Sequence, residues 1–148
     1  MARQKDAWVE EGCAHYAKLL SRFAKLTITV IPPASESSSF SGEEIKSREA
    51  RLISKRLPKG YLIGLSEKGR THSSESFGKL LEKWQTISSG SVTFVIGGAF
   101  GLDKDFLDDC DYLLSLSEMT LPHQLARLVM LEQLYRGFSI LANTDYHK

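Results

Sequence analysis

The sequence is poor in the residues that build metal centres and disulfide frameworks. Its 148 residues include only two cysteines and four histidines, and Cys13 and Cys110 lack the spacing of metal ligands. We interpret the cysteines as free thiols in a reducing cytoplasm, where disulfides are rare, and we expect no bound metal. The formal net charge is only +1, so nucleic-acid binding would require a local basic patch rather than an overall positive field.

The sequence also lacks an apolar run of the roughly 20 residues that a membrane-spanning helix needs. The first residues, Met1 to Asp6, have no apolar centre of a secretory signal, so we expect a cytoplasmic protein without a membrane partner. Several catalytic signatures are missing too: G-x-S-x-G, H-E-x-x-H, the P-loop and the complete G-x-G-x-x-G. These absences argue against common hydrolases, nucleoside triphosphatases and Rossmann dehydrogenases.

The pattern of apolar residues predicts alternating helices and strands. The length favours a single domain over residues 1–148. Helical spacing predicts helices at about residues 6–25, 43–57, 74–85, 103–109 and 123–141. Alternating or buried-type runs predict strands at residues 26–31, 61–65, 92–96 and 112–116, and the serine-rich residues 34–42 a loop. This order predicts an α/β fold with a mainly parallel sheet flanked by helices.

Three polar or glycine-containing stretches follow predicted strands, at residues 65–69, 97–101 and 116–121. Ligands of parallel α/β sheets bind at the carboxyl ends of strands, so we expect these stretches to meet at one edge. Gly97 and Gly98 would let backbone amides approach a ligand closely. By themselves these glycines are equally compatible with a tight turn that binds nothing.

The last predicted helix is apolar over most of its circumference, which indicates burial on more than one side. We expect a second copy of the chain to cover part of this helix in a dimer. The alternative is that the helix lies at the centre of a monomer. Arg127 and Arg136 lie on different faces of this helix, and each requires a phosphate or an internal carboxylate as its partner. The end of the chain, Tyr146-His147-Lys148, either frays or clamps an extruded base.

Several strings of residues together resemble a known family. They are V-I-G-G-A-F-G-L, L-S-L-S-E-M-T-L-P-H-Q-L-A-R, E-Q-L-Y-R-G-F and the terminal Y-H-K. The chain resembles the small SPOUT-class ribosomal RNA methyltransferases, in particular the RlmH type, which are large-subunit pseudouridine N3-methyltransferases. The resemblance implies a C-terminal trefoil knot, bound S-adenosylmethionine and a homodimer. It implies a pseudouridine of 23S-type ribosomal RNA as the target, presented on the assembled ribosome.

The resemblance also assigns roles to residues. The cofactor would be held by Leu65, Gly97, Leu116, Ser117, Glu118, Met119, Thr120 and Leu121. The target nucleotide would be held by Arg136, Tyr146 and His147, with His147 the best candidate for a general base because imidazole titrates near neutral pH. RNA phosphates would be contacted by the side chains of His123, Arg127 and Lys148.

One departure from the family concerns the start of the chain. Family members begin with a β-strand before the first helix, and this strand is missing here, so we expect unpaired backbone on its neighbours. Two other functions stay open. One is a non-catalytic relative that binds ribosomes or RNA, and the other is an enzyme that uses a different nucleotide-like ligand in the glycine-loop slot.

Overall fold

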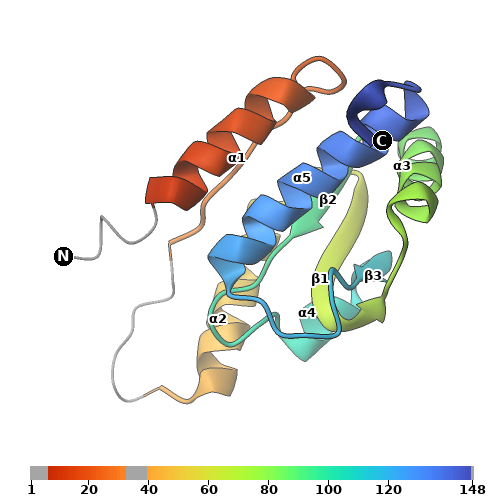
Figure 1. The fold of residues 1–148 in the computed structure, drawn as a ribbon. Helices are drawn as coiled ribbons and strands as arrows, with labels where there is room; N and C mark the ends of the chain where they lie inside the picture. Colours follow the sequence, from red (N-terminus) through yellow and green to blue (C-terminus); the bar gives the residue numbers. More distant parts are fainter. Residues whose placement is uncertain (1–6, 33–39, 148) are drawn as a thin grey trace.

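The computed structural model describes residues 7–32 and 40–147 (Figure 1). Its elements follow the order α1 (Ala7–Leu20), α2 (Gly42–Ser54), β1 (Tyr61–Arg70), α3 (Ser74–Ile87), β2 (Val92–Val95), α4 (Lys104–Asp108), β3 (Tyr112–Leu114), α5 (His123–Leu141) and the 3₁₀ turn η2 (Asp145–His147). Within these described residues, no helix has the length and apolar character needed to cross a membrane.

The strands form one sheet in the order β2-β1-β3, and both pairings are parallel. Tyr61 is in register with Val92, and Ile63 with Tyr112. The parallel α/β architecture predicted from the alternation of elements is therefore confirmed. It follows from the β-branched and aromatic runs, which form strands, and from the intervening segments with helical spacing.

Helices cover both faces of the sheet (Figure 1). On one face, α1, α3 and α5 bury a core with the fully buried Ile63 and Leu114 of the sheet. On the other face, α2 and α4 bury a smaller core around Ile53, Val95 and Phe106. Trp84 of α3 lies at the centre of the first core, where only 1% of its surface is exposed. The domain thus has three layers.

Two helices of the same chain cover much of the apolar circumference of α5. The helix packs against α1 and α3 and lies between them in Figure 1. Gly78 of α3 and Gly137 of α5 allow a close approach, since a Cβ at Gly78 would lie 3.3 Å from the Gly137 carbonyl oxygen. Leu125 and Val129 of α5 are only half-buried and Leu141 is 38% exposed, so a dimer stays a prediction.

The predicted strand at residues 26–31 is wrong, because these residues form no strand. Leu26 packs against the core of α1, α3 and α5, and Ile31 against the core of α2 and α4. Ile28 and Val30 are 46% and 74% exposed. A β-branched run becomes a strand only when another strand satisfies its backbone N–H and C=O groups, and no described strand pairs with this one.

The predicted loop after the second strand is also different, since β1 continues to Arg70. Leu114 of β3 is paired with both Leu65 and Arg70, and the Ser115 N–H donates to the Arg70 carbonyl (3.0 Å). Gly69 lies directly against β3, because a Cβ there would come within 2.6 Å of the Leu114 carbonyl carbon. Of the predicted loop at residues 34–42, residues 34–39 lie outside the described residues, and Gly42 is already the first residue of α2.

Candidate functional site

The register of the sheet brings the three predicted stretches to one edge. Gly64 is paired with Val95, and Leu65 with Leu114. Because the strands are parallel, β2 and β3 end beside Gly64 and Leu65 of β1, which itself continues to Arg70. The stretches after β2 and β3 therefore leave the sheet on either side of β1, as the sequence predicted, whereas residues 65–69 stay in the strand.

The glycine loop after β2 is a closed turn. The Gly101 N–H donates to the Gly98 carbonyl (3.0 Å), and Gly101 has a φ of 79°. A Cβ at Gly97 would lie 2.5 Å from the carbonyl carbon of Gly101 and 2.7 Å from the N of Leu102. The backbone of the loop itself thus requires glycine at position 97. This finding accounts for the glycine without a ligand, so a cofactor contact at Gly97 stays a prediction.

The loop after β3 is held by two serines. The Ser115 hydroxyl donates to the Ser117 carbonyl (2.8 Å), and Ser117 Oγ accepts the N–H of Met119 (2.9 Å). Leu116, Ser117 and Leu121 are half-buried. Glu118, Thr120 and Met119 are exposed, the last to 77%. The loop is a defined turn whose middle residues face solvent and are free to contact a ligand.

A cavity of about 300 Å³ opens beside this loop, between β3, α3 and α5. Its walls are His72, Ser73, Ser74, Phe77, Leu114, Ser115, Leu116, Val129 and Gln133. His72 Nε2 and the Tyr112 hydroxyl lie 2.6 Å apart and form a hydrogen bond. The polar lining residues His72, Ser73, Ser74, Ser115 and Gln133 outnumber the apolar ones. Small-molecule sites are usually more apolar than this, and the volume lies at the lower end of their range.

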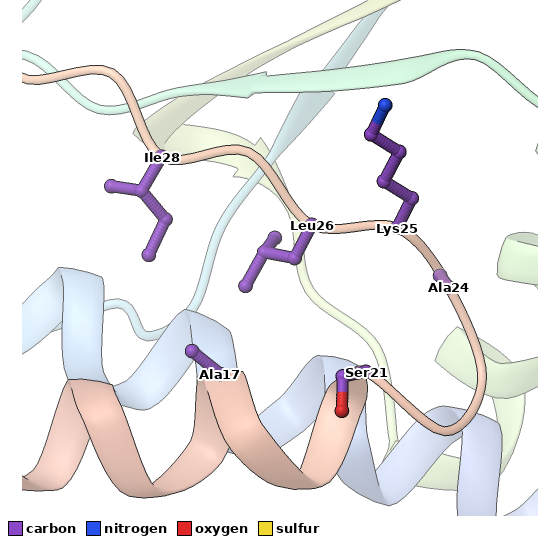
Figure 2. Close-up of a pocket in the computed structure, with 6 residues that line it drawn as sticks. All are labelled: Ala17, Ser21, Ala24, Lys25, Leu26 and Ile28. Carbon is purple, nitrogen blue, oxygen red and sulfur yellow. The ribbon is translucent and has the colours of Figure 1, made fainter.

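A second, larger cavity of about 580 Å³ lies elsewhere, between α1 and the chain that leaves it. Figure 2 shows Leu26 and Ile28 on the side of α1 and Lys25 pointing the other way. The other lining residues are Ala17, Ser21 and Ala24. None of the residues predicted for a site lines this cavity, so its size alone does not make it a candidate.

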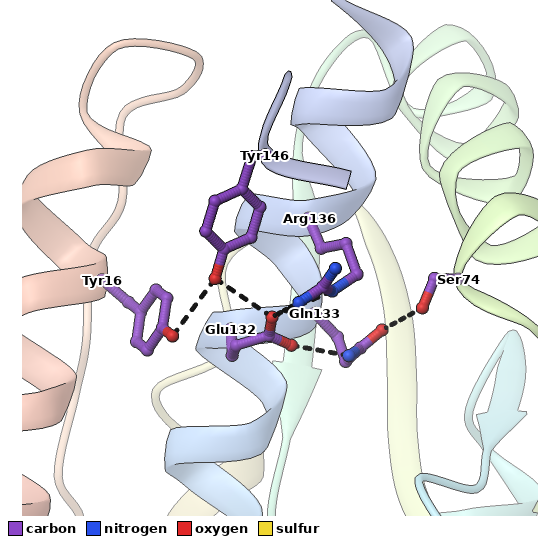
Figure 3. Close-up of polar contacts among 6 residues, drawn as sticks. All are labelled: Tyr16, Ser74, Glu132, Gln133, Arg136 and Tyr146. Atoms are coloured by element: carbon purple, nitrogen blue, oxygen red, sulfur yellow. Dashed lines mark hydrogen bonds and ion pairs between the residues drawn. The ribbon is translucent and has the colours of Figure 1, made fainter. Parts of the chain in front are cut away.

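Arg136 and Tyr146, two of the three residues predicted to hold a nucleotide, meet in one polar cluster (Figure 3). Arg136 donates from Nε and Nη2 to Glu132 Oε1, at 2.9 and 2.6 Å. Tyr146 donates its hydroxyl proton to the same oxygen (3.2 Å). The turn η2 therefore packs back on α5, and Tyr146 does not fray.

The ring of Tyr146 is fixed by aromatic contacts. It lies edge-on to Tyr135, with 4.5 Å between the ring centroids, and 4.9 Å from the Arg136 guanidinium carbon. Its hydroxyl lies 3.2 Å from that of Tyr16 on α1. Burial, followed by the hydrogen bond with Tyr16, raises the pKa of Tyr146 well above its usual range. The phenol keeps its proton at neutral pH, so it is a hydrogen-bond donor and not a base.

Arg127 has a different partner from Arg136, as their spacing predicted. It forms an ion pair with Glu10 of α1, and its side chain is 19% exposed. His123 is exposed at the first residue of α5. Lys148 and the side chain of His147 lie outside the described residues. RNA contacts by His123, Arg127 and Lys148 therefore stay predictions, and Arg127 would have to share its charge with Glu10.

Comparison with known proteins supplies the family. The sequence model described as predicted SPOUT methyltransferase matches residues 1–147. The chain belongs to the SPOUT methyltransferase family. A protein of Acetivibrio thermocellus named ribosomal RNA large subunit methyltransferase H is 43% identical over 97% of this chain and 93% of its own length. The proteins of the same name from Syntrophotalea carbinolica and Pelotomaculum thermopropionicum are 41% and 38% identical over 99% of this chain and 94% of their own lengths.

Four residues of the polar cluster in this SPOUT chain were not among the predicted site residues, although an internal carboxylate was one of the two partners expected for Arg136. Glu132 and Gln133 of α5, Ser74 of α3 and Tyr16 of α1 all belong to the cluster of Figure 3. The spacing of Glu132 and Arg136 at i and i+4 was an available signal, since such residues are neighbours on a helix. The contact of Tyr16 could not be predicted from the sequence, because it depends on how α1 packs on α5.

Among the described residues, no group of side chains could hold a metal ion. The surroundings of the two thiols raise the pKa of each. Burial raises the pKa of Cys13. Burial, with Asp111 and Asp109 nearby, raises the pKa of Cys110 to about 11. Since only the thiolate is nucleophilic, neither cysteine acts as a nucleophile at neutral pH.

This conclusion is checked by thiol labelling. At pH 8 the native protein should react with a disulfide reagent roughly 100-fold more slowly than the unfolded chain, because a thiol with a pKa near 11 forms little thiolate there. The rate should rise with pH up to about pH 11. Fast labelling of the native protein at pH 8 would contradict the burial of both groups.

Proposed function

We propose that this SPOUT protein transfers a methyl group from S-adenosylmethionine to N3 of a pseudouridine in large-subunit ribosomal RNA, on the assembled ribosome. The observation that carries the proposal is the similarity of nearly the whole chain to proteins named ribosomal RNA large subunit methyltransferase H. The site at the carboxyl edge of the sheet supports it, because it joins a ligand-sized cavity to an arginine and a tyrosine suited to RNA.

The residues at this edge fit the cofactor. Leu65 and Leu116 provide apolar surface for a flat base, and the exposed Glu118, Met119 and Thr120 provide a side wall with polar groups. The glycine loop follows β2, which pairs with β1 on the side away from β3, and we assign its backbone N–H and C=O groups to the cofactor as well. When bound, S-adenosylmethionine supplies a methyl group that its sulfonium already activates, so the protein mainly has to align the methyl group with the target nitrogen.

The cluster around Glu132 fits the target nucleotide. Arg136 uses two donor atoms on Glu132, and its other N–H groups remain for a phosphate, which a guanidinium binds well. The ring of Tyr146 offers a face on which an extruded base can stack. Because Tyr146 keeps its own proton, we assign removal of the N3 proton to His147, since histidine is the side chain most often used as a general base.

The proposal includes a trefoil knot, a homodimer and a cytoplasmic location. The knot is proposed from the similarity of nearly the whole chain to the family. The dimer would place the active site near the interface between two copies. Sedimentation equilibrium at micromolar concentration should give twice the mass of one chain, and a monomer mass would remove the dimer from the proposal.

Calorimetric titration tests cofactor binding directly. S-adenosylmethionine should bind saturably to the 148-residue protein. Met119→Ala should weaken binding about 10-fold, equivalent to roughly 1.4 kcal/mol, without changing the melting temperature, because the Met119 side chain is 77% exposed. Val30→Ala is the matched control, since Val30 is 74% exposed and lies outside the site. A folded protein that does not bind the cofactor would favour the non-catalytic alternative.

A further inference from the structure

We propose that Glu132 is a positioning residue of the methyl-transfer site, which holds Arg136 and Tyr146 in one fixed arrangement for the target nucleotide. The inference rests on the proposed function. It assigns a role to a residue that touches neither the nucleotide nor the cofactor and acts through the two side chains bound to it.

The contacts of the carboxylate carry the proposal. Oε1 of Glu132 accepts hydrogen bonds from Arg136 and from Tyr146, which come from α5 and η2. Without this shared acceptor, the guanidinium and the phenol have no common partner among the described contacts. Charge-assisted hydrogen bonds to one oxygen therefore act together with the direct contact between the guanidinium and the ring, and both fix the cation relative to Tyr146.

The second oxygen of the carboxylate is also fixed. Gln133 Nε2 donates to Glu132 Oε2 (2.6 Å), and the Ser74 hydroxyl donates to Gln133 Oε1 (2.9 Å). Figure 3 shows this chain of contacts running from α5 to α3. Ser74 and Gln133 also line the 300 Å³ cavity. The carboxylate is thus held from both sides, and the cluster adjoins a cavity that Leu116, one of the residues proposed to hold the methyl donor, also lines.

The alternative is a structural ion pair on a helix surface. Such a pair at i and i+4 contributes little to stability. The side chain of Glu132 is 19% exposed, and its carboxylate is bonded to three residues of α5 and η2. A structural role predicts that loss of the charge changes stability slightly. A positioning role predicts that it changes the use of the RNA substrate.

The test measures methyl transfer from labelled S-adenosylmethionine to ribosomes, with wild type, Glu132→Gln, Tyr146→Phe and Arg136→Ala. Glu132→Gln keeps the shape of the side chain and removes its charge. We expect kcat/KM for ribosomes to fall about 10- to 100-fold, because misplacement by about 1 Å has effects of this size. The Kd of the cofactor and the melting temperature should stay close to wild type. Glu82→Gln on the exposed side of α3 is the matched control.

The double variant Glu132→Gln/Arg136→Ala decides between the two roles. If Glu132 acts through Arg136 and Tyr146, the double variant should lose much less than the product of the two single losses, since residues in one unit are not additive. Wild-type rates for a folded Glu132→Gln, or losses that multiply in the double variant, would overturn the proposal.

A second variant applies if Glu132→Gln does not fold. Tyr146→Phe removes one hydrogen bond to the carboxylate and should still lower kcat/KM, and an unchanged rate would overturn the proposal. A wild type that binds the cofactor but transfers no methyl would contradict the proposed function itself.

Discussion

Trp84→Ala is expected to lower the free energy of unfolding by about 3–5 kcal/mol, the usual range for removing a fully buried tryptophan. Trp84 contacts the rings of Tyr61, Phe77, Phe94 and Tyr112, with centroid distances of 6.1, 6.1, 6.1 and 5.1 Å. Three of these rings come from β1, β2 and β3, so the indole joins all strands of the sheet to α3. Its loss leaves a cavity that the surrounding strands cannot fill.

Urea denaturation followed by circular dichroism measures this effect. Trp8→Ala is the matched control, because Trp8 is 58% exposed on α1, and its loss should change the free energy of unfolding by less than about 0.5 kcal/mol. Equal losses for the two tryptophans would mean that the sheet is not packed around Trp84 as described.

Arg136→Ala is expected to lower kcat/KM for ribosomes about 100-fold or more. The substitution removes a cation placed beside the Tyr146 ring and leaves the half-buried Glu132 carboxylate without its main partner. The bare carboxylate would then face an RNA substrate of the same charge. Cofactor affinity should change little, since Arg136 does not line the cavity.

Two control variants make the result specific. Arg136→Lys keeps the charge but loses the planar fork that holds Glu132 Oε1, so it should recover only part of the rate. Arg56→Ala removes an exposed arginine outside the cluster and should leave kcat/KM near wild type. If Arg136→Lys were fully active, charge alone would suffice and the geometry of the cluster would be irrelevant.

Periodicity predicted the helices and the three paired strands well. The range 123–141 predicted for the last helix is that of α5, because its apolar residues repeat without interruption from the residue after Pro122 onward. The prediction failed at residues 26–31 for a physical reason. Strand propensity describes a side-chain preference, whereas a strand also requires a hydrogen-bonding neighbour, which a local pattern cannot supply.

Those parts of the candidate site could be predicted that depend on the order of the strands or on the spacing of residues along one helix. Residues at the ends of parallel strands converge by topology, and Arg136 and Glu132 are neighbours on one helix. The contacts of Arg127 with Glu10 and of Tyr146 with Tyr16 join residues more than 100 positions apart. Such contacts depend on how α1 packs on α5. The glycine at position 97 was predicted, but its cause is the backbone of its own loop.

Methyl transfer to ribosomes tests the central claim most directly. The 148-residue protein is incubated with methyl-labelled S-adenosylmethionine and with ribosomes whose large-subunit pseudouridines are unmethylated, and the RNA nucleosides are identified by mass spectrometry. We predict label on N3 of a pseudouridine of the large-subunit RNA, with far less on free RNA. A folded protein that binds ribosomes or cofactor but transfers no label, or that labels another nucleoside, would contradict the proposed function.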